Sequence, residues 1–425
     1  MKKYLFIFTV IFLTISVSAQ DFDNFFYDKT MRFDYIHAGN HTSEYYYFNR
    51  LKEEPFYAGS KTNLIDPDDY GVQMFKIIDA ASGKEIYSQG FCTLFNEWQT
   101  TAEATQTQRA FPESVVFPYP KKAAIIELYA RNEKMGLDKE FEYHINPDSY
   151  FIEKFIPIYH TFEVVKTGNP THCVDIVLIP EGYLASQRTK FEEACQFFAD
   201  EFFKYSPFKE NRNRFNIVAV WAPSLDEGVT IPGEYVWKRT ATGANFYTFD
   251  SERYLTISDF QQLRDIASHV AYDFIYVLSN TQKYGGGGIY NFYGISAAHH
   301  PALTGKVYLH EFGHLMLGLG DEYVGGVAFN EMYPANREPW EPNLTTLVDF
   351  DKKAWKRMLD DQTPVPTPAT KEYANILGVF EGGGYVSKGV YRPRQQCLMN
   401  QLHLSDSFCP VCQKAITDSI DFLTQ

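Results

Sequence analysis

The sequence contains no concentrated run of lysine and arginine, and its formal net charge at pH 7 is -14. Nucleic acids and anionic membranes bind proteins through local positive charge, so neither is expected as the main partner. Internal repeats and low-complexity tracts are also missing. These absences favour an acidic globular protein of the kind found outside cells.

Long apolar runs are missing as well, except at the N-terminus. There two lysines precede an apolar run from Tyr4 to Val17, and small residues follow up to Ala19. This pattern predicts a signal peptide, residues 1–19, cleaved after Ala19. A retained anchor is the alternative, but the run is shorter than the roughly 20 residues that span a bilayer. No cysteine follows the run to carry a lipid. We therefore expect a secreted or periplasmic protein with no transmembrane segment in the mature chain.

Cysteine is scarce, with six residues in 425. An oxidising compartment permits disulfides, and we expect a structural disulfide that involves Cys397. The neighbouring segment Cys409-Pro410-Val411-Cys412 is also compatible with a small metal knuckle or a redox pair, because C-x-x-C serves both. The pairing cannot be deduced from sequence.

Aromatic residues, in contrast, are abundant at 17%, and a chain of 425 residues favours two domains. From about Asp21 to Tyr159, short segments rich in Tyr, Phe and β-branched residues alternate with turn signals. Examples are Glu44–Asn49, Gly71–Ile78 and Ala123–Ala130. This pattern predicts an all-β sandwich over residues 20–165, in which no catalytic constellation is visible.

Beyond this region, strand and helix patterns alternate. The predicted order is strand, helix, strand, helix, strand, over Val174–Pro180, Gln187–Tyr205, Phe215–Trp221, Ser258–Ala271 (with Ser258 as N-cap) and Phe274–Leu278. Such alternation indicates an α/β domain with a mixed, mostly parallel sheet over residues 166–425.

A helix predicted over Val307–Leu317 carries the motif His310-Glu311-Phe312-Gly313-His314. Residues four apart lie on one helix face, so both imidazoles can reach one zinc ion. Glu311 is placed to accept a proton from the attacking water as general base. A buried helix that acquired these residues by chance is the alternative, but the motif's position after an α/β layer in an exported chain argues against it.

Two glycines, Gly318 and Gly320, end this helix and let the chain turn back. A carboxylate just beyond them, Asp321 or Glu322, can complete a site with three protein ligands and an open fourth position.

The segment from His310 to Tyr323 resembles the signature of the bacterial IgA metallopeptidase family and, more distantly, of the metzincins. The tetrapeptide Cys397-Leu398-Met399-Asn400 is similar to the methionine turn of metzincins. The β-rich N-terminal part also looks like the extra domain of that family. The resemblance implies a metzincin-like zinc peptidase domain that binds one Zn²⁺, with Met399 packed beneath the metal.

The resemblance also points to Asp321 as the third metal ligand, with Glu322 as the alternative and Glu331 as a more remote candidate. Asp321 lies seven residues after His314, whereas metzincins usually place this ligand six residues after the second histidine. The choice between Asp321 and Glu322 therefore stays open.

Residues around the motif suggest further roles. Tyr323, Tyr385 and Tyr391 are candidates to stabilise the oxyanion, and the sequence does not choose among them. The run Gly285–Gly288 leads into the β-prone segment Ile289–Ile295, which in metzincin-like folds forms a rim where a peptide adds as a strand. A flexible hairpin with no substrate role is the alternative.

Together these features predict a secreted zinc endopeptidase that hydrolyses extracellular protein or peptide substrates, with Glu311 as catalytic base and His310, His314 and Asp321 as metal ligands. The alternative is a catalytically inactive, peptidase-like adhesin or a glycan- or protein-binding module. A zinc hydrolase of a non-peptide substrate is a third possibility.

Overall fold

The computed structural model describes residues 22–325 and 332–425. The predicted signal peptide, residues 1–19, and Glu331 lie outside the described residues. Among the helices of the described residues, none combines the length and apolar character needed to cross a bilayer.

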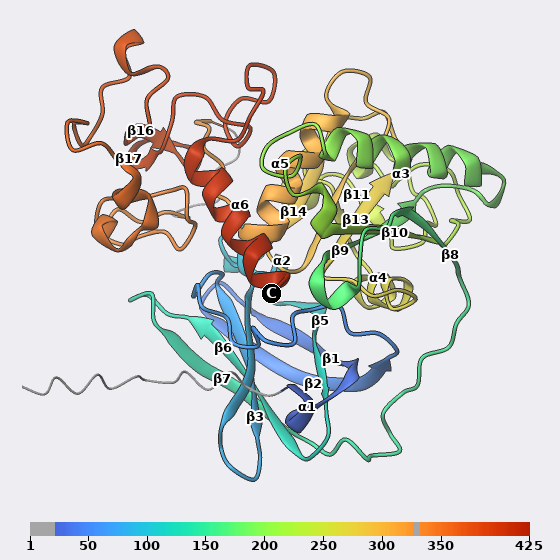
Figure 1. Cartoon of the computed structure of the whole chain (residues 1–425). Coiled ribbons are helices and arrows are strands. Elements are labelled where there is room, and N and C mark those ends of the chain that lie inside the picture. The colour runs from blue at the N-terminus through green and yellow to red at the C-terminus, as the bar shows by residue number, and fades with distance from the viewer. Residues whose placement is uncertain (1–21, 326–331) are drawn as a thin grey trace, which may run out of the picture.

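Two antiparallel sheets make up the N-terminal region, at the bottom of Figure 1. One sheet has the order β2-β1-β5 and the other β4-β3-β6-β7. The strands are β1 (Phe26–Asn40), β2 (Ser43–Glu54), β3 (Gln73–Asp79), β4 (Glu85–Phe91), β5 (Arg109–Pro120), β6 (Ala124–Arg131) and β7 (Leu137–Ile145), with short helices α1 (Phe22–Phe25) and α2 (Leu94–Gln99). In β6 every second side chain is buried, as expected for a strand with one face on a core. Both sheets contribute to one hydrophobic cluster, which is the arrangement of a β-sandwich.

A six-stranded sheet with the order β14-β15-β13-β9-β10-β8 forms the centre of the second region. Its strands are β8 (His160–Val165), β9 (Val174–Glu181), β10 (Phe215–Trp221), β13 (Phe274–Ser279), β14 (Gly286–Ile289) and β15 (Tyr293–Ala297). The four central strands are parallel, and β14 and β8 are antiparallel edges. All eight residues of β9 are buried, because helices cover both faces of the sheet. The prediction of a β-rich region followed by a mixed α/β region is confirmed. Strand β8 lies within the range 20–165 that we predicted for the N-terminal domain, but it pairs with β10 of this sheet.

Helices α3 (Arg188–Phe202), α5 (Thr304–Leu317) and α6 (Pro410–Leu423) share one hydrophobic cluster, and α4 (Phe260–Ala267) packs in another cluster with the opposite face of β9 and β13. Ser258 was predicted as the N-cap of α4. The structure shows that Asp259 caps it instead, since its Oδ1 accepts a hydrogen bond from Gln262 N–H at 3.0 Å. The remaining strands form two small ribbons, β11 (Ala244–Asn245) with β12 (Thr256–Ile257) and β16 (Phe380–Gly383) with β17 (Val386–Arg392).

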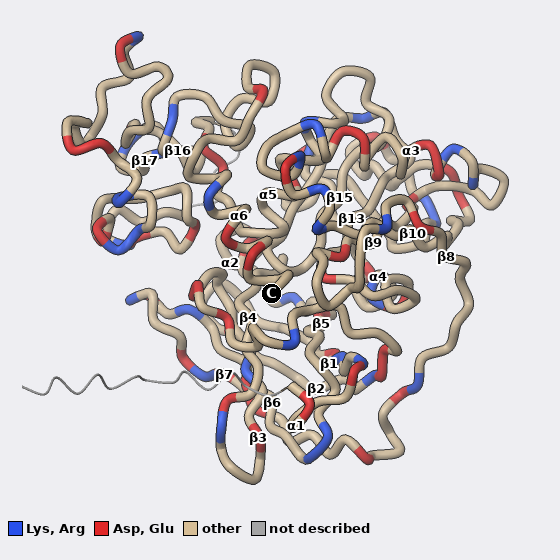
Figure 2. Tube along the Cα trace, in the orientation of Figure 1, with Lys and Arg blue, Asp and Glu red and all other residues tan. Residues whose placement is uncertain are grey.

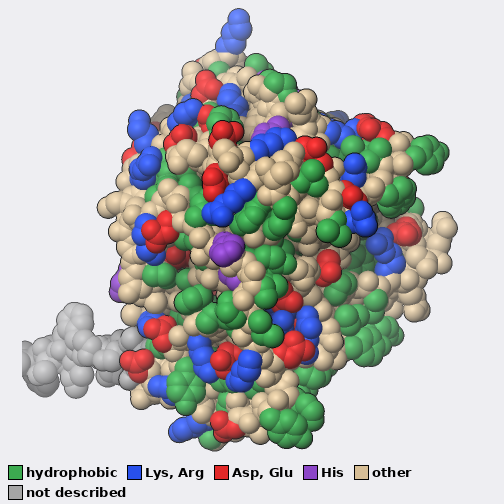
Figure 3. All heavy atoms as spheres, turned by 90° about the vertical axis from the view of Figure 1, so that its right-hand side faces the viewer, with side chains coloured by type: hydrophobic (Ala, Val, Ile, Leu, Met, Phe, Trp, Pro, Cys, Tyr) green, Lys and Arg blue, Asp and Glu red, His purple; other side chains and the backbone are tan. Residues whose placement is uncertain are grey.

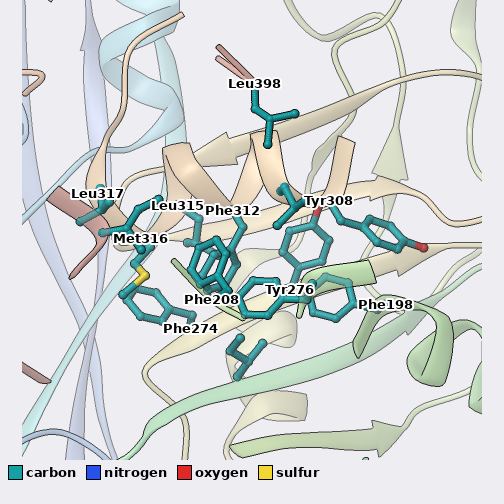
Figure 4. Close-up of a cluster of buried hydrophobic side chains, with 14 of the residues drawn as sticks. Phe198, Phe208, Phe274, Tyr276, Tyr308, Phe312, Leu315, Met316, Leu317 and Leu398 are labelled. Carbon is teal, nitrogen blue, oxygen red and sulfur yellow. The ribbon is translucent and has the colours of Figure 1, made fainter. Parts of the chain in front are cut away.

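Large aromatic side chains hold α5 against the sheet (Figure 4). The ring of Phe312 packs edge-on against those of Phe202, at 4.9 Å between centroids, and Phe274, at 5.6 Å. Phe312 lies between the two histidines of the motif and is fully buried. Its burial fixes the rotation of α5, and therefore turns His310 and His314 away from this core.

Polar contacts tie the two regions together. Arg32 of β1 is fully buried and its Nη2 lies 2.8 Å from Asp265 Oδ1 of α4. Cys92 N–H donates to Tyr290 O at 3.0 Å. Acidic and basic residues are scattered along the chain in Figure 2, and on the face shown in Figure 3 they are interspersed with apolar side chains.

Candidate metal centre and cleft

His310 and His314 lie one turn apart on α5, with their Nε2 atoms 3.2 Å from each other. The Nδ1 of His310 is 2.9 Å from Leu398 O, and the Nδ1 of His314 contacts Leu319 O. A carbonyl oxygen only accepts hydrogen bonds, so both rings carry their proton on Nδ1. The two Nε2 lone pairs therefore converge on one point.

Asp321 completes the group because the chain reverses directly after α5. Gly318 ends the helix with a left-handed φ of 57°, which glycine adopts at little cost. Asp321 Oδ1 then lies 3.0 Å from His310 Nε2 and 3.4 Å from His314 Nε2. We call His310, His314 and Asp321 the metal triad.

The metal triad fits a zinc ion. Ligand atoms at about 2.0–2.1 Å from a tetrahedral zinc are separated by about 3.3 Å, and the three separations in the triad range from 3.0 to 3.4 Å. Asp321 Oδ1 is buried and receives no hydrogen bond. Two imidazole lone pairs and a carboxylate oxygen at contact distance need a cation between them.

The attraction between the histidines and the aspartate also shifts the pKa values of these ligands. Burial lowers the pKa of His310, but the close carboxylate of Asp321 outweighs burial and raises the pKa to about 9. Burial raises the pKa of Asp321, but the interactions with His314 and His310 hold it well below its usual range. The triad thus attracts positive charge, as protons or as a metal ion.

Glu311 lies beside the triad and lines the same cavity. Burial raises the pKa of Glu311, whereas His310 and His314 lower it. The glycine-rich strand β14 runs across this part of α5. A Cβ on Gly286 would lie 2.6 Å from Glu311 Oε1, and a Cβ on Gly288 2.2 Å from Glu311 O. Glycine is needed here because the strand and the helix approach so closely.

The predicted tyrosines occupy different places. Tyr385 donates a hydrogen bond from its hydroxyl to Asp321 Oδ2, and so orients the carboxylate. Tyr323 also lines the cavity, with its ring centroid 5.3 Å from that of Tyr385. Tyr391 is on β17 and packs against the hydrophobic core instead. Met399 is fully buried beneath α5, where a Cβ on Gly313 would lie 3.0 Å from its sulfur.

A cavity of about 960 Å³ opens over the metal triad between the two regions of the chain. One wall comes from the N-terminal region, including Thr93, Asn96, Glu97 and Arg131. Glu97 accepts a hydrogen bond from the Tyr254 hydroxyl at 2.5 Å, and burial raises its pKa to about 7. No catalytic constellation is visible in the sequence of this region, and its contribution to the cavity was not predicted. No local signal reveals it, because these residues, which come from α2 with its N-cap and from β6, reach the cavity only through the packing of the two regions.

Glu322, the alternative third ligand, does not face the metal triad. Its Oε1 lies 3.4 Å from Cys412 Sγ and accepts a hydrogen bond from Asn343 Nδ2 at 3.0 Å.

All six cysteines carry free thiols, so the expected disulfide that involves Cys397 is wrong. Cys397 Sγ is 3.9 Å from Cys412 Sγ, whereas disulfide sulfurs lie about 2.05 Å apart. The disulfide is replaced by a cluster in which these sulfurs meet Glu322.

Comparison with known families covers most of the chain. Residues 162–376 and 369–420 match the family model described as IgA Peptidase M64, and residues 21–142 match the model described as Peptidase M64 N-terminus. A search of curated proteins found no match.

Proposed function

The chain belongs to the IgA Peptidase M64 family, and from this premise we propose that it is a secreted zinc endopeptidase that hydrolyses peptide bonds in extracellular proteins. This family is one of metallopeptidases, and a peptidase implies protein substrates. The observation that carries the zinc assignment is the convergence of three ligand atoms at separations of 3.0–3.4 Å. The predicted signal peptide supports secretion.

In this proposal His310, His314 and Asp321 hold the zinc ion. Bound in this way, zinc acts as a Lewis acid that polarises the scissile carbonyl and lowers the pKa of a coordinated water towards about 7. Leu398 O and Leu319 O fix the tautomers of the two histidines, and Tyr385 fixes the carboxylate. Met399 packs beneath α5 and carries no chemistry, as in a metzincin-like methionine turn.

Glu311 is the general base. Its carboxylate takes the proton of the attacking water and then delivers it to the leaving amine. Burial outweighs the influence of His310 and His314 and raises the pKa of Glu311, which makes it a stronger base than an exposed glutamate. Tyr323, which lines the cavity beside Tyr385, is the candidate to donate a hydrogen bond to the oxyanion.

Substrate access supports a polymeric substrate. The cavity is bounded by strand β14 on one side and by the N-terminal region on another. Strand β14 is the edge of the six-stranded sheet, where an extended peptide can add through main-chain hydrogen bonds. Part of this edge is already occupied, since Gly286 O accepts a hydrogen bond from Leu255 N–H at 3.2 Å. The part of β14 open to an added peptide strand is therefore the segment after Gly286.

Glu311→Gln tests the proposal. The amide keeps the shape of the side chain and cannot accept the proton, so cleavage of a diverse peptide pool should fall about 10²- to 10⁴-fold. Zinc content and thermal unfolding should match the wild type. Equal cleavage by both proteins would remove Glu311 from the mechanism. No cleavage by the wild type on any protein substrate would favour the alternative, a peptidase-like adhesin or binding module.

A further inference from the structure

A second group of metal-ligating side chains lies beneath the metal triad. Three thiols and one carboxylate have ligand atoms within 4.8 Å of one another and are almost completely buried: Glu322, Cys397, Cys409 and Cys412. We call them the cysteine–glutamate cluster. Glu322 follows the metal triad in sequence, Cys397 precedes Met399, and the other two cysteines begin α6.

We propose that the cysteine–glutamate cluster binds a second zinc ion with a structural role. The proposed peptidase uses only the zinc ion of the metal triad, so this site is additional to it. Four protein ligands leave no open position for a substrate, which is typical of structural zinc sites.

The distances within the cluster match the edges of a zinc tetrahedron. With Zn–S bonds of about 2.3 Å and a Zn–O bond of about 2.0 Å, tetrahedral geometry separates two sulfurs by about 3.8 Å and a sulfur from an oxygen by about 3.5 Å. Cys412 Sγ lies 3.9 Å from Cys397 Sγ, 3.5 Å from Cys409 Sγ and 3.4 Å from Glu322 Oε1. Glu322 Oε1 is also 3.9 Å from Cys409 Sγ.

Three features of the surroundings fit a metal-bound cluster. Glu322 Oε2 is buried without a hydrogen-bond partner, a costly state for a carboxyl group unless its charge is compensated nearby. Cys409 N–H points at Cys397 Sγ, 3.2 Å away, as expected for an acceptor sulfur. Cys409 is the N-cap of α6 and Cys412 lies in its first turn, where the helix dipole stabilises thiolates.

A disulfide explains the cluster less well. Cys412 is nearly equidistant from the other two sulfurs, at 3.5 and 3.9 Å. A bond between any two of them would leave the third thiol and Glu322 buried together without a charge partner. Soft thiolate ligands with one carboxylate suit Zn²⁺, which needs no redox partner.

The cluster is connected to the metal triad through hydrogen bonds to two main-chain carbonyls. Glu322 N–H donates to Met399 O at 2.7 Å, and Leu398 O accepts the hydrogen bond of His310 Nδ1 at 2.9 Å. A metal ion bound to Glu322 and Cys397 therefore fixes both chain segments that support the triad. Its loss should loosen the catalytic zinc as well.

The test is metal analysis of the full-length protein with two variants. The wild type should contain two zinc ions per chain, and His314→Ala should retain one. X-ray absorption of the His314→Ala protein should show mainly sulfur ligands at about 2.3 Å. Cys412→Ser should lose the cluster zinc, whereas Cys195→Ser, which replaces a buried cysteine of α3 outside the cluster, should keep two.

The outcomes separate this proposal from the peptidase proposal. If the triad bound no metal, the wild type would hold one sulfur-ligated zinc that His314→Ala leaves in place, and the cluster site would stand. A zinc-free His314→Ala protein, or a disulfide among the cluster cysteines in unreduced peptide maps of the wild type, would overturn it. These two measurements do not need Cys412→Ser to fold.

Discussion

At the scale of single residues, the orientation of Asp321 depends on Tyr385. Tyr385 adopts a left-handed φ of 69°, and its N–H donates to Tyr323 O at 3.0 Å, which brings its hydroxyl onto Asp321 Oδ2. Partners of this kind keep a metal ligand in place.

We predict that Tyr385→Phe lowers the zinc affinity of the triad about 10- to 100-fold, because the carboxylate loses the donor that orients it. Competition with a chelator measures this affinity. Tyr391→Phe is the matched control, since Tyr391 packs on the core away from the cavity and should leave the affinity unchanged. Equal affinities in the wild type and Tyr385→Phe would show that Tyr385 does not support the site.

The metal triad could be predicted from the sequence because its residues are close in the chain. The spacing of His310 and His314 follows from the helix period, and Gly318 marks the reversal that brings Asp321 back. The sequence alone does not show which of Asp321 and Glu322 faces the histidines. That depends on Met399 and on Cys409 and Cys412, which lie far along the chain and come close only in the folded protein.

At the scale of elements, the position of β14 against α5 depends on glycine. A Cβ on Gly288 would lie 2.2 Å from Glu311 O and 2.9 Å from His314 Cβ, so the strand must move away from the helix to accept any side chain.

Gly288→Ala should therefore destabilise the protein by about 1–3 kcal/mol, the usual range for overpacking. It should also reduce peptide cleavage, because β14 borders the cavity. Denaturant unfolding measures the first effect. Gly136→Ala is the control: its Cβ would meet only the end of the Asn132 side chain at 3.3 Å, so a change below about 0.5 kcal/mol is expected. A Gly288→Ala protein as stable and active as the wild type would contradict this account of the glycines.

Most elements were predictable from periodicity, and the errors fall at boundaries and caps. The apolar run at Val174 and the helix around Phe312 are strong signals, and both are present as β9 and α5. The N-cap of α4 was placed one residue early, because Ser258 and Asp259 are both good caps and only the hydrogen bond to Gln262 N–H distinguishes them. Helix α2 was not predicted, since its six residues are too few for a helical period.

At the scale of the whole molecule, the β-sandwich and the α/β region are joined by a partly buried ion network. Asp265 of α4 lies 2.8 Å from Arg32 Nη2 and 2.6 Å from Lys52 Nζ, both from the N-terminal region. Burial raises the pKa of Asp265, but the charges of Arg32 and Lys52 outweigh it and lower the pKa below its usual value.

Because the pKa of Asp265 is lower in the folded than in the unfolded chain, its stabilising effect is fully present above the unfolded value of about 3.9 and is lost as the pH falls through the folded value. We predict that Asp265→Asn destabilises the protein by about 1–2 kcal/mol at pH 7, and that the difference shrinks below about pH 4.

Urea unfolding at several pH values checks this dependence. Asp418→Asn, which removes an exposed pair with Lys414 on α6, is the control and should change stability by less than about 0.5 kcal/mol. A destabilisation of Asp265→Asn that is constant between pH 7 and pH 3 would contradict an electrostatic origin.

Sequence patterns indicated two regions but could not show that the cleft lies between them. That arrangement brings Glu97 and Arg131 opposite the metal triad, and it arises from contacts between distant segments, such as Cys92 N–H with Tyr290 O. The N-terminal region is therefore part of the cavity wall.

Anomalous diffraction at the zinc edge tests the central claim most directly. Crystals of the full-length protein should show a peak about 2.0–2.2 Å from each of His310 Nε2, His314 Nε2 and Asp321 Oδ1. In crystals of Asp321→Ala this peak should weaken or vanish. A wild-type protein that cleaves peptides but has no peak at the triad, or a peak in which Glu322 replaces Asp321, would contradict the account.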